Sequence, residues 1–483
     1  MLFHTWTFAA FFLIFYPVFF ALKNTRGRLP WLLAASYVFY GFAEPLYVLL
    51  LFYATSIDYL AVVGMSRSQR RRPWLVLSVV NNLVLLSFFK YGAFVADNLN
   101  DLATRLGVPY AMPVPGTWLA DVLDRLFAQC GVSYVVPDFG AVLPVGISFF
   151  VFQSMSYTID YYRGNVRREP SFIRYATFVS LFPQLVAGPI ERAKNLLPQI
   201  ACRPAISRQD VADGFSLFVV GLFKKVALAD CLAQFVDPIY NGLGPSTAAP
   251  ALILATVAFA WQIYFDFSGY TDMARGIGRM LGLRLMLNFN HPYLATGLGD
   301  FWRRWHISLS TWFRDYVYIP LGGNRRGAVL TYVAMCLTMI VSGLWHGPLW
   351  KFVVWGTLHA AGRAATRTME ASATYRDRVP TLVKRTWTFA FVSFAWIFFR
   401  ANNLDDAWLI VGRIARFTWA DPRCPLLLAA LVLCVWLYQF ICESKFRNLL
   451  ALPPVRVGLV VAMLLYVAMT GGTDDKAFIY FQF

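Results

Sequence analysis

Long apolar runs separated by short polar loops dominate this chain. A helix needs about 20 apolar residues to cross a bilayer, and thirteen stretches approach that length. Several are short or interrupted by proline, which is typical of re-entrant helices that survive only when packed inside protein. We therefore predict an all-α, polytopic transmembrane protein with about 11 true spans. The apolar stretches lie near residues 6–22, 31–43, 46–64, 74–96, 141–162, 172–190, 213–232, 249–268, 328–345, 350–366, 386–399, 425–441 and 456–470.

The charges of the loops predict how the chain crosses the membrane. Basic loops at 23–28 and 67–72 belong on the cytoplasmic side under the positive-inside rule, which puts the N-terminus outside. The net-acidic stretch 97–138 then lies outside, and the basic segment 445–456 lies inside. The tail 471–483 is consequently expected outside.

Composition supports a membrane protein and argues against a nucleic-acid partner. The 483 residues are 58% hydrophobic and 14% charged, with a mean hydropathy of +0.53, whereas soluble domains are about 25% charged. The net charge of +17 falls mostly in loops between apolar runs, so we expect no nucleic acid to bind. The seven cysteines form no CxxC pair, so we expect neither a disulfide framework nor a metal site.

We predict a single membrane domain over residues 1–483, because no repeat or low-complexity linker is evident. Polar residues embedded in apolar sequence concentrate in 140–370. Polar and ionisable groups are costly inside a membrane, so this stretch is the predicted catalytic core.

His346 is the first candidate for catalysis. It ends the segment Val341-Ser342-Gly343-Leu344-Trp345-His346 and is followed by Gly347 and Pro348. An imidazole titrates near neutral pH, so at such a helix end it is suited to removing a proton from a hydroxyl. The alternative is an interfacial histidine that caps the C-terminus of a helix. Residue type alone leaves both interpretations open.

His306 is the second candidate. Aromatic and apolar residues recur at helical spacing across 300–316, which predicts an amphipathic helix on or within the bilayer surface, with Asp300 as its N-cap. His306 falls within the apolar stripe of that helix. It either faces a reaction chamber or merely packs against neighbours.

Other polar groups in apolar surroundings have a structural interpretation. Asp266 and Asp272 end one apolar run and precede several arginines, so ion pairing is expected first and contact with a polar donor second. The segment 181–191 is typical of a re-entrant turn, in which Gln184 and Glu191 either line a cavity or serve the fold alone.

The tail 471–483 ends in the alternating aromatic segment Phe478-Ile479-Tyr480-Phe481-Gln482-Phe483. An interfacial aromatic anchor would explain it. The functional hypothesis is that the phenol of Tyr480 is a nucleophile that holds an acyl group transiently.

Taken together, these segments resemble the membrane-bound O-acyltransferase (MBOAT) family, in the branch of the bacterial alginate O-acetyltransferases and of the acyltransferase of teichoic-acid D-alanylation. The matching stretches are FPQLVAGPIERAKNLLPQI (182–200), YFDFSGYTDMARGIGRMLGL (264–283), the run from Asn288 through WRRWHISLSTWFRDYVYIPLGG to Asn324, and VSGLWHG (341–347). The resemblance extends from the first apolar run to the terminal FIYFQF. It implies a ring of helices around a central funnel, where an acyl donor and an acceptor meet from opposite sides.

The resemblance also implies roles for residues. His346 would be the general base, His306 would position the donor or the transferred acyl group, and Tyr480 would relay the acyl group across the membrane. The donor substrate would be acetyl-CoA, with no tightly bound cofactor. The acceptor would be an exported polysaccharide, alginate-like above all, reached directly or through a periplasmic SGNH-type acetyltransferase partner.

This resemblance implies a multi-pass protein of the bacterial inner membrane, surrounded by membrane lipid. Two other functions fit many spans with polar groups among them. One is a transporter of a lipid-linked or acylated intermediate, and the other is a non-catalytic scaffold of a polysaccharide export complex. Both predict that His346 is dispensable for the chemistry.

Overall fold

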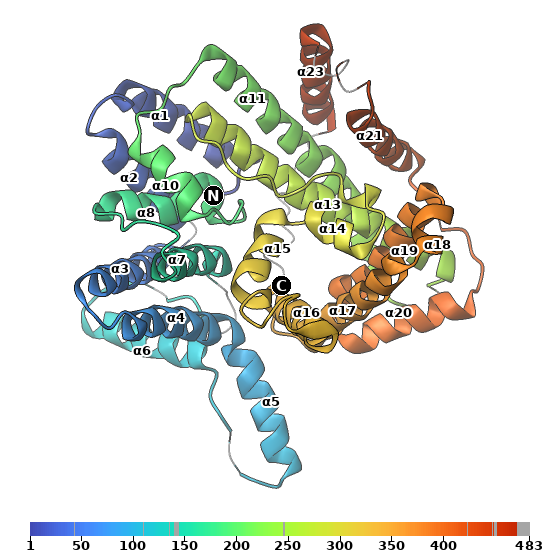
Figure 1. The fold of residues 1–483 in the computed structure, drawn as a ribbon, viewed down its shortest axis with the longest axis horizontal. Coiled ribbons are helices and arrows are strands. Elements are labelled where there is room, and N and C mark those ends of the chain that lie inside the picture. Colours follow the sequence, from blue (N-terminus) through green and yellow to red (C-terminus); the bar gives the residue numbers. More distant parts are fainter. Residues whose placement is uncertain are drawn as a thin grey trace. The chain divides into compact units, whose positions relative to one another are not determined.

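The fold is that of a computed structural model, which describes all residues except 43, 110, 135, 140–143, 245–246, 423, 447, 449–451 and 471–483. The described residues form helices and loops and contain no strand (Figure 1). The prediction of an all-α protein is thereby confirmed. The chain divides into two compact units, one of residues 1 and 10–204 and one of residues 2–9 and 205–483. The expectation of a single domain over 1–483 stays a prediction.

The first unit is built around a buried carboxylate. Asp58 on α3 is fully buried and accepts hydrogen bonds from Ser78 Oγ at 2.6 Å, Asn82 Nδ2 at 2.9 Å and Ser154 Oγ. Ser154 in turn lies 2.8 Å from the hydroxyl of Tyr175. This network joins α3, α4, α7 and α8, and it satisfies a charge whose burial alone would be costly. The helices are α1 (Trp6–Leu22), α2 (Arg28–Gly41), α3 (Leu46–Arg67), α4 (Arg72–Leu86), η1 (Ser87–Tyr91), α5 (Gly92–Arg105), α6 (Pro115–Gln129), α7 (Ile147–Tyr162), α8 (Phe172–Ser180), α9 (Phe182–Leu185) and α10 (Ala193–Ala201).

The segment predicted as a re-entrant turn is short, broken and buried. The chain leaves α8 at Ser180, forms the single turn α9 and continues without helix to α10. Gln184 on α9 donates a hydrogen bond from Nε2 to the carbonyl of Phe178 at 2.6 Å. Glu191 is fully buried as well. This hydrogen bond gives Gln184 a structural role within the first unit.

The second unit centres on α13, a helix of 32 residues along which α11 packs. The two helices approach so closely that a Cβ on Gly221 would lie 2.4 Å from the carbonyl oxygen of Gly269. Small residues at such contacts are typical of membrane helices, which associate by close packing. The helices are α11 (Arg208–Leu222), η2 (Phe223–Ala229), α12 (Asp230–Asn241), α13 (Ala249–Met280), η3 (Pro292–Leu294), α14 (Leu298–Arg304), α15 (Ile307–Phe313), η4 (Arg314–Tyr318), α16 (Gly327–His346), α17 (Trp350–Ala371), α18 (Ala373–Arg378), α19 (Thr381–Arg400), α20 (Leu404–Arg416), α21 (Leu426–Glu443) and α23 (Pro453–Thr470).

Each of the thirteen apolar runs contains helix among its described residues, although 172–190 is divided between α8 and α9 and is not helical after Leu185. Among the described residues, five helical segments are long and apolar enough to cross a membrane by themselves. These segments are Leu46–Arg67, Arg72–Arg105, Ala249–Met280, Gly327–His346 and Thr381–Arg400. The total of about 11 spans stays a prediction, since the shorter apolar helices fall below that length.

The two aspartates that precede the arginines are ion-paired, as predicted. Lys225, on the π-helix η2, is 4% exposed at its side chain and lies 2.8 Å from both Asp266 and Asp230. The adjacent Lys224 lies 2.7 Å from Asp272, which also pairs with Arg275 at 3.3 Å. These pairs tie η2 to the middle of α13.

Replacing Lys225 with methionine is expected to destabilise the protein strongly. The buried carboxylate of Asp266 would lose the ammonium beside it, and breaking a buried pair in this way costs about 3–5 kcal/mol. The measurement is the midpoint of thermal unfolding in detergent. Lys224→Met is the matched control. Its unfolding midpoint should fall less, because Asp272 keeps its ion pair with Arg275. Equal losses for the two variants would contradict this account.

Candidate functional site

The backbones of α16 and α17 touch, and this contact fixes the position of His346. A Cβ on Gly343 would lie 2.3 Å from the carbonyl oxygen of Phe352, and a Cβ on Gly356 would lie 2.6 Å from that of Met339. No larger side chain fits at either place without moving a helix. The close approach brings the end of α16 against the first turns of α17 (Figure 1).

His346 is the last residue of α16 and is 4% exposed. Its ring is surrounded by aromatic rings in edge-on contacts, with centroid distances of 5.1 Å to Trp345, 5.1 Å to Trp355 and 5.3 Å to Phe399. The structure therefore places this imidazole at a helix end, as predicted. It is buried within the unit among these rings.

His306 lies at a break between two short helices, which corrects the prediction of one amphipathic helix over 300–316. α14 ends at Arg304, Trp305 is extended, and His306 adopts the left-handed conformation with φ 42° before α15 begins. The aromatic periodicity is real, but the backbone bends where it predicted continuity. Asp300 is also not the N-cap, which is Gly297; its carboxylate pairs with Arg304 at 3.2 Å.

Asn288 holds the bend on the C-terminal side of His306. Its carbonyl accepts a hydrogen bond from the backbone N–H of Ile307 at 2.9 Å, and its side-chain oxygen accepts one from the N–H of Ser308 at 3.3 Å. These two donors belong to the first turn of α15 and have no partner within that helix. The loop that contains Asn288 thus supplies the acceptors that stabilise the break.

Trp345 connects the two predicted histidines. His306 is fully buried and packs edge-on against Phe267, with ring centroids 4.7 Å apart. The ring of Trp345 lies 6.0 Å from His306 and 5.1 Å from His346. Two positions 40 residues apart in the sequence are therefore neighbours across one indole. Tyr480, the third predicted site residue, lies outside the described residues.

A third histidine belongs to the same cluster, and sequence reasoning had missed it. His359 on α17 is fully buried, and its ring lies 4.6 Å from Trp355 and 5.1 Å from Trp302. Trp355 contacts both His359 and His346, so two indoles link all three imidazoles. A usable signal was the spacing of four residues that places Trp355, His359, Arg363 and Arg367 on one face of α17. Within the described ranges, no group of His, Cys, Asp and Glu could hold a metal ion.

A basic cavity of about 670 Å³ adjoins this cluster. Four arginines contribute to its wall, and the aromatic residues around them include Trp302. Ile307, the neighbour of His306, and Ser342, one helical turn before His346, line it as well. The arginines are Arg303, Arg314, Arg363 and Arg367. A cavity with this lining is suited to an anionic ligand, because guanidinium groups bind phosphates with two parallel hydrogen bonds.

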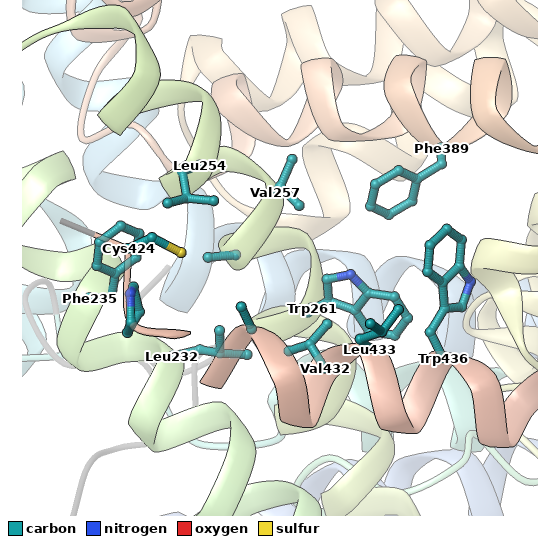
Figure 2. A pocket seen from close by; sticks show the side chains of 13 residues that line it. Leu232, Phe235, Leu254, Val257, Trp261, Phe389, Cys424, Val432, Leu433 and Trp436 are labelled. Carbon is teal, nitrogen blue, oxygen red and sulfur yellow. The ribbon is translucent and has the colours of Figure 1, made fainter. Parts of the chain in front are cut away.

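A second cavity, of about 260 Å³, has the opposite character. Figure 2 shows Trp261, Phe389 and Trp436 at one end and Phe235 and Cys424 at the other. The lining is apolar throughout and contains no charged side chain. It offers no charge to neutralise an anionic ligand, in contrast to the basic cavity.

Known proteins have similar sequences. Residues 162–404 match the profile of MBOAT, the membrane-bound O-acyltransferase family. The chain belongs to this family. It is 39% identical over 421 residues to a probable alginate O-acetylase of Azotobacter vinelandii, which covers 85% of this chain and 77% of that protein. A probable alginate O-acetylase of Pseudomonas aeruginosa is 39% identical over 419 residues. This alignment covers 85% of the present chain and 74% of that protein. The peptidoglycan O-acetyltransferase of Helicobacter pylori is 34% identical over 417 residues. This alignment covers 80% of the present chain and 73% of that protein.

Membership of the MBOAT family confirms that the protein is an acyltransferase and a multi-pass membrane protein. The matched region contains all three clustered histidines and the four arginines of the basic cavity. The roles of His346, His306 and Tyr480 stay predictions.

Proposed function

We propose that this protein is an O-acetyltransferase of the bacterial inner membrane, which passes acetyl from cytoplasmic acetyl-CoA to an exported polysaccharide. An alginate-like exopolysaccharide is the acceptor that we favour. The names of the relatives support acetyl as the acyl group and a polysaccharide as the acceptor. The observation that carries the proposal is the basic cavity that ends one helical turn from His346.

The cavity suits acetyl-CoA in charge and position. The donor carries several phosphate charges, and the four arginines that line the cavity supply matching positive charge. Arg367 also contacts the side-chain oxygen of Asn324 at 3.5 Å, and Arg363 pairs with Glu370 at 3.3 Å, so both guanidinium groups are held in place. Arginines close to the ends of membrane segments favour the cytoplasmic side, which is where acetyl-CoA is available.

The chemistry then needs one base and a place for an oxyanion. His346 removes the proton of the accepting hydroxyl, and the oxygen attacks the thioester carbonyl. The tetrahedral oxyanion is stabilised by nearby hydrogen-bond donors. Its collapse forms the ester, breaks the C–S bond and releases the thiol of CoA, which takes up the proton from His346. His306, beside Trp345, positions the acyl group for this step.

Tyr480 is the proposed first acceptor in a relay. Its phenol would receive the acetyl group, and a periplasmic SGNH-type transferase would move that group onward to the sugar. In the direct alternative, the sugar hydroxyl attacks the thioester itself, and Tyr480 is not needed.

Membrane vesicles test the donor and the relay together. Inverted vesicles from cells that make the polymer are supplied with acetyl-CoA radiolabelled in the acetyl group, and base-labile label is counted. We expect incorporation in inverted vesicles and none in right-side-out vesicles, because the donor site faces the cytoplasm. Tyr480→Phe should abolish incorporation if the relay operates.

Two results would contradict the proposal. Labelling of right-side-out vesicles equal to or above that of inverted vesicles would show that donor use is not confined to the cytoplasmic face. No labelling at all, with the protein present in the membrane at normal levels, would exclude acetyl-CoA as donor. Full labelling of the Tyr480→Phe variant would exclude the relay alone and leave direct transfer.

A further inference from the structure

The histidine cluster contains buried nitrogen atoms that lack hydrogen bonds. Among the residues that the structure describes, none forms a hydrogen bond with Nδ1 or Nε2 of His359, or with Nε1 of Trp302 or Trp355, and all four atoms are buried. Leaving a buried polar group without a partner destabilises a protein, so native structures contain few such groups. The three rings that carry these four nitrogen atoms are in mutual contact, and this arrangement calls for a functional explanation.

Nearby buried polar groups do have partners. The ammonium of Lys351, at the start of α17, donates hydrogen bonds to the carbonyls of Phe399 at 3.3 Å and Ala401 at 2.6 Å. The hydroxyl of Tyr293 donates to the carbonyl of Ala260 at 2.5 Å. The same unit thus satisfies a charge and a phenol in its interior. Pairing is not complete, however, since Nε1 of Trp396, whose ring stacks on Trp355, is also buried without a hydrogen bond from the described residues. The unpaired nitrogen atoms thus gather on the rings that meet around Trp355.

These atoms lie between the basic cavity and His346. Trp355 contacts His346 at one side and His359 at the other, with centroid distances of 5.1 and 4.6 Å. Trp302 contacts both Trp355 and His359, is half-buried, and lines the cavity. One turn beyond His359 on the same face of α17 stands Arg363, which lines the cavity too. Trp302 is the member of this group that a ligand in the cavity can touch, and Trp355 connects it to His346.

The surroundings of His359 select a neutral ligand group. Phe301 stacks on the imidazole and Phe391 packs edge-on against it. A phosphate would not be stabilised among these rings, because burying a charge requires a counter-charge. A neutral imidazole offers one donor and one acceptor, and each indole offers one donor. An amide or a thioester carbonyl complements such a set.

We propose that His359, together with the indole N–H groups of Trp302 and Trp355, forms a binding site for the amide-bearing arm of the acyl thioester, between the arginines and His346. This inference rests on the proposed function and names the residues that hold the middle of its donor. The arm enters past Trp302, the part of the cluster that faces the cavity.

The test is the His359→Phe variant, assayed in inverted vesicles at varied acetyl-CoA and for thermal unfolding in detergent. Phenylalanine keeps a ring of similar size and removes both nitrogen atoms. If His359 binds the donor, the KM for acetyl-CoA rises about tenfold, while the unfolding midpoint is unchanged or higher because two unpaired polar atoms are gone. His359→Gln, which restores a donor and an acceptor, should recover part of the lost affinity.

Phe391→Leu is the matched control, since it loosens the packing around the same imidazole and removes no polar atom. It should lower the unfolding midpoint and leave the KM for acetyl-CoA near that of wild type. A His359→Phe variant with wild-type KM would overturn the inference, as would one whose unfolding midpoint falls as far as that of Phe391→Leu. If wild-type vesicles do not use acetyl-CoA, the proposed function fails as well; if they do, a normal His359→Phe variant overturns the subsite alone.

Discussion

Replacing His346 with alanine is expected to remove polymer-linked acetate from cells while polymer secretion continues. A positioned general base contributes about 10²- to 10⁴-fold to the rate, so the remaining transfer should approach background. The measurement is acetate released by mild base from purified polymer, at membrane levels of the variant matched to wild type. Matched levels matter because His346 is buried among three aromatic rings, and its loss leaves a gap there.

His291→Asn is the control for this experiment. His291 also has a left-handed backbone, with φ 46°, which asparagine tolerates, and it lies outside the linked histidine cluster. Its acetate level should stay near that of wild type. Unchanged acetate in the His346→Ala variant would remove this residue from the chemistry and would favour the scaffold or transporter function.

The double variant Arg363→Gln with Arg367→Gln is expected to raise the KM for acetyl-CoA about 100-fold or more, since each charge-assisted hydrogen bond is worth roughly 1.5–3 kcal/mol. Both residues line the basic cavity from one face of α17. The measurement is transfer in inverted vesicles over a range of acetyl-CoA concentrations. Added salt should raise the KM for acetyl-CoA in wild type more than in the variant. The reason is that salt screens the charges of Arg363 and Arg367, which the variant lacks.

Arg376→Gln provides the comparison for a lost surface charge. Arg376 lies on α18, is exposed, pairs with Asp377 at 3.1 Å and does not line the cavity. Its KM and salt response should match those of wild type. A normal KM in the double variant would show that the donor binds elsewhere, and it would leave the role of His346 untouched.

Most of the fold follows from hydrophobic patterning. Each apolar run contains helix among its described residues, and the pairing of Asp266 and Asp272 with basic residues was expected from their chemistry alone. The break at Trp305 and His306 was missed, because the aromatic periodicity runs on through it. What bends the backbone is Asn288, 18 residues earlier, which supplies acceptors to α15. The periodicity of residues 300–316 cannot reveal a hydrogen-bond partner that lies so far away in the sequence.

The candidate site, too, was predicted only in part from the sequence. His346 and His306 stand in distinctive local sequences, and both were predicted. The proximity of the two histidines depends on Trp345 and on the glycine contact between α16 and α17, which only packing reveals. His359 was missed because a single histidine in an apolar helix has no local signature, although its spacing from Arg363 was visible. The basic cavity requires α14, α16 and α17 to be assembled.

The left-handed backbone at His306 restricts which amino acids can replace this histidine in related proteins. Apart from glycine, few residues adopt φ near 42° at small cost, with asparagine, aspartate and histidine prominent among them. Of these, histidine alone has a side chain that ordinarily titrates between pH 5 and 8. A lineage that lost this imidazole could keep the bend through asparagine or glycine, yet no other tolerated residue would restore the same chemistry. Only reversion of the original codon would regain it, so a histidine here is easily lost and hard to replace.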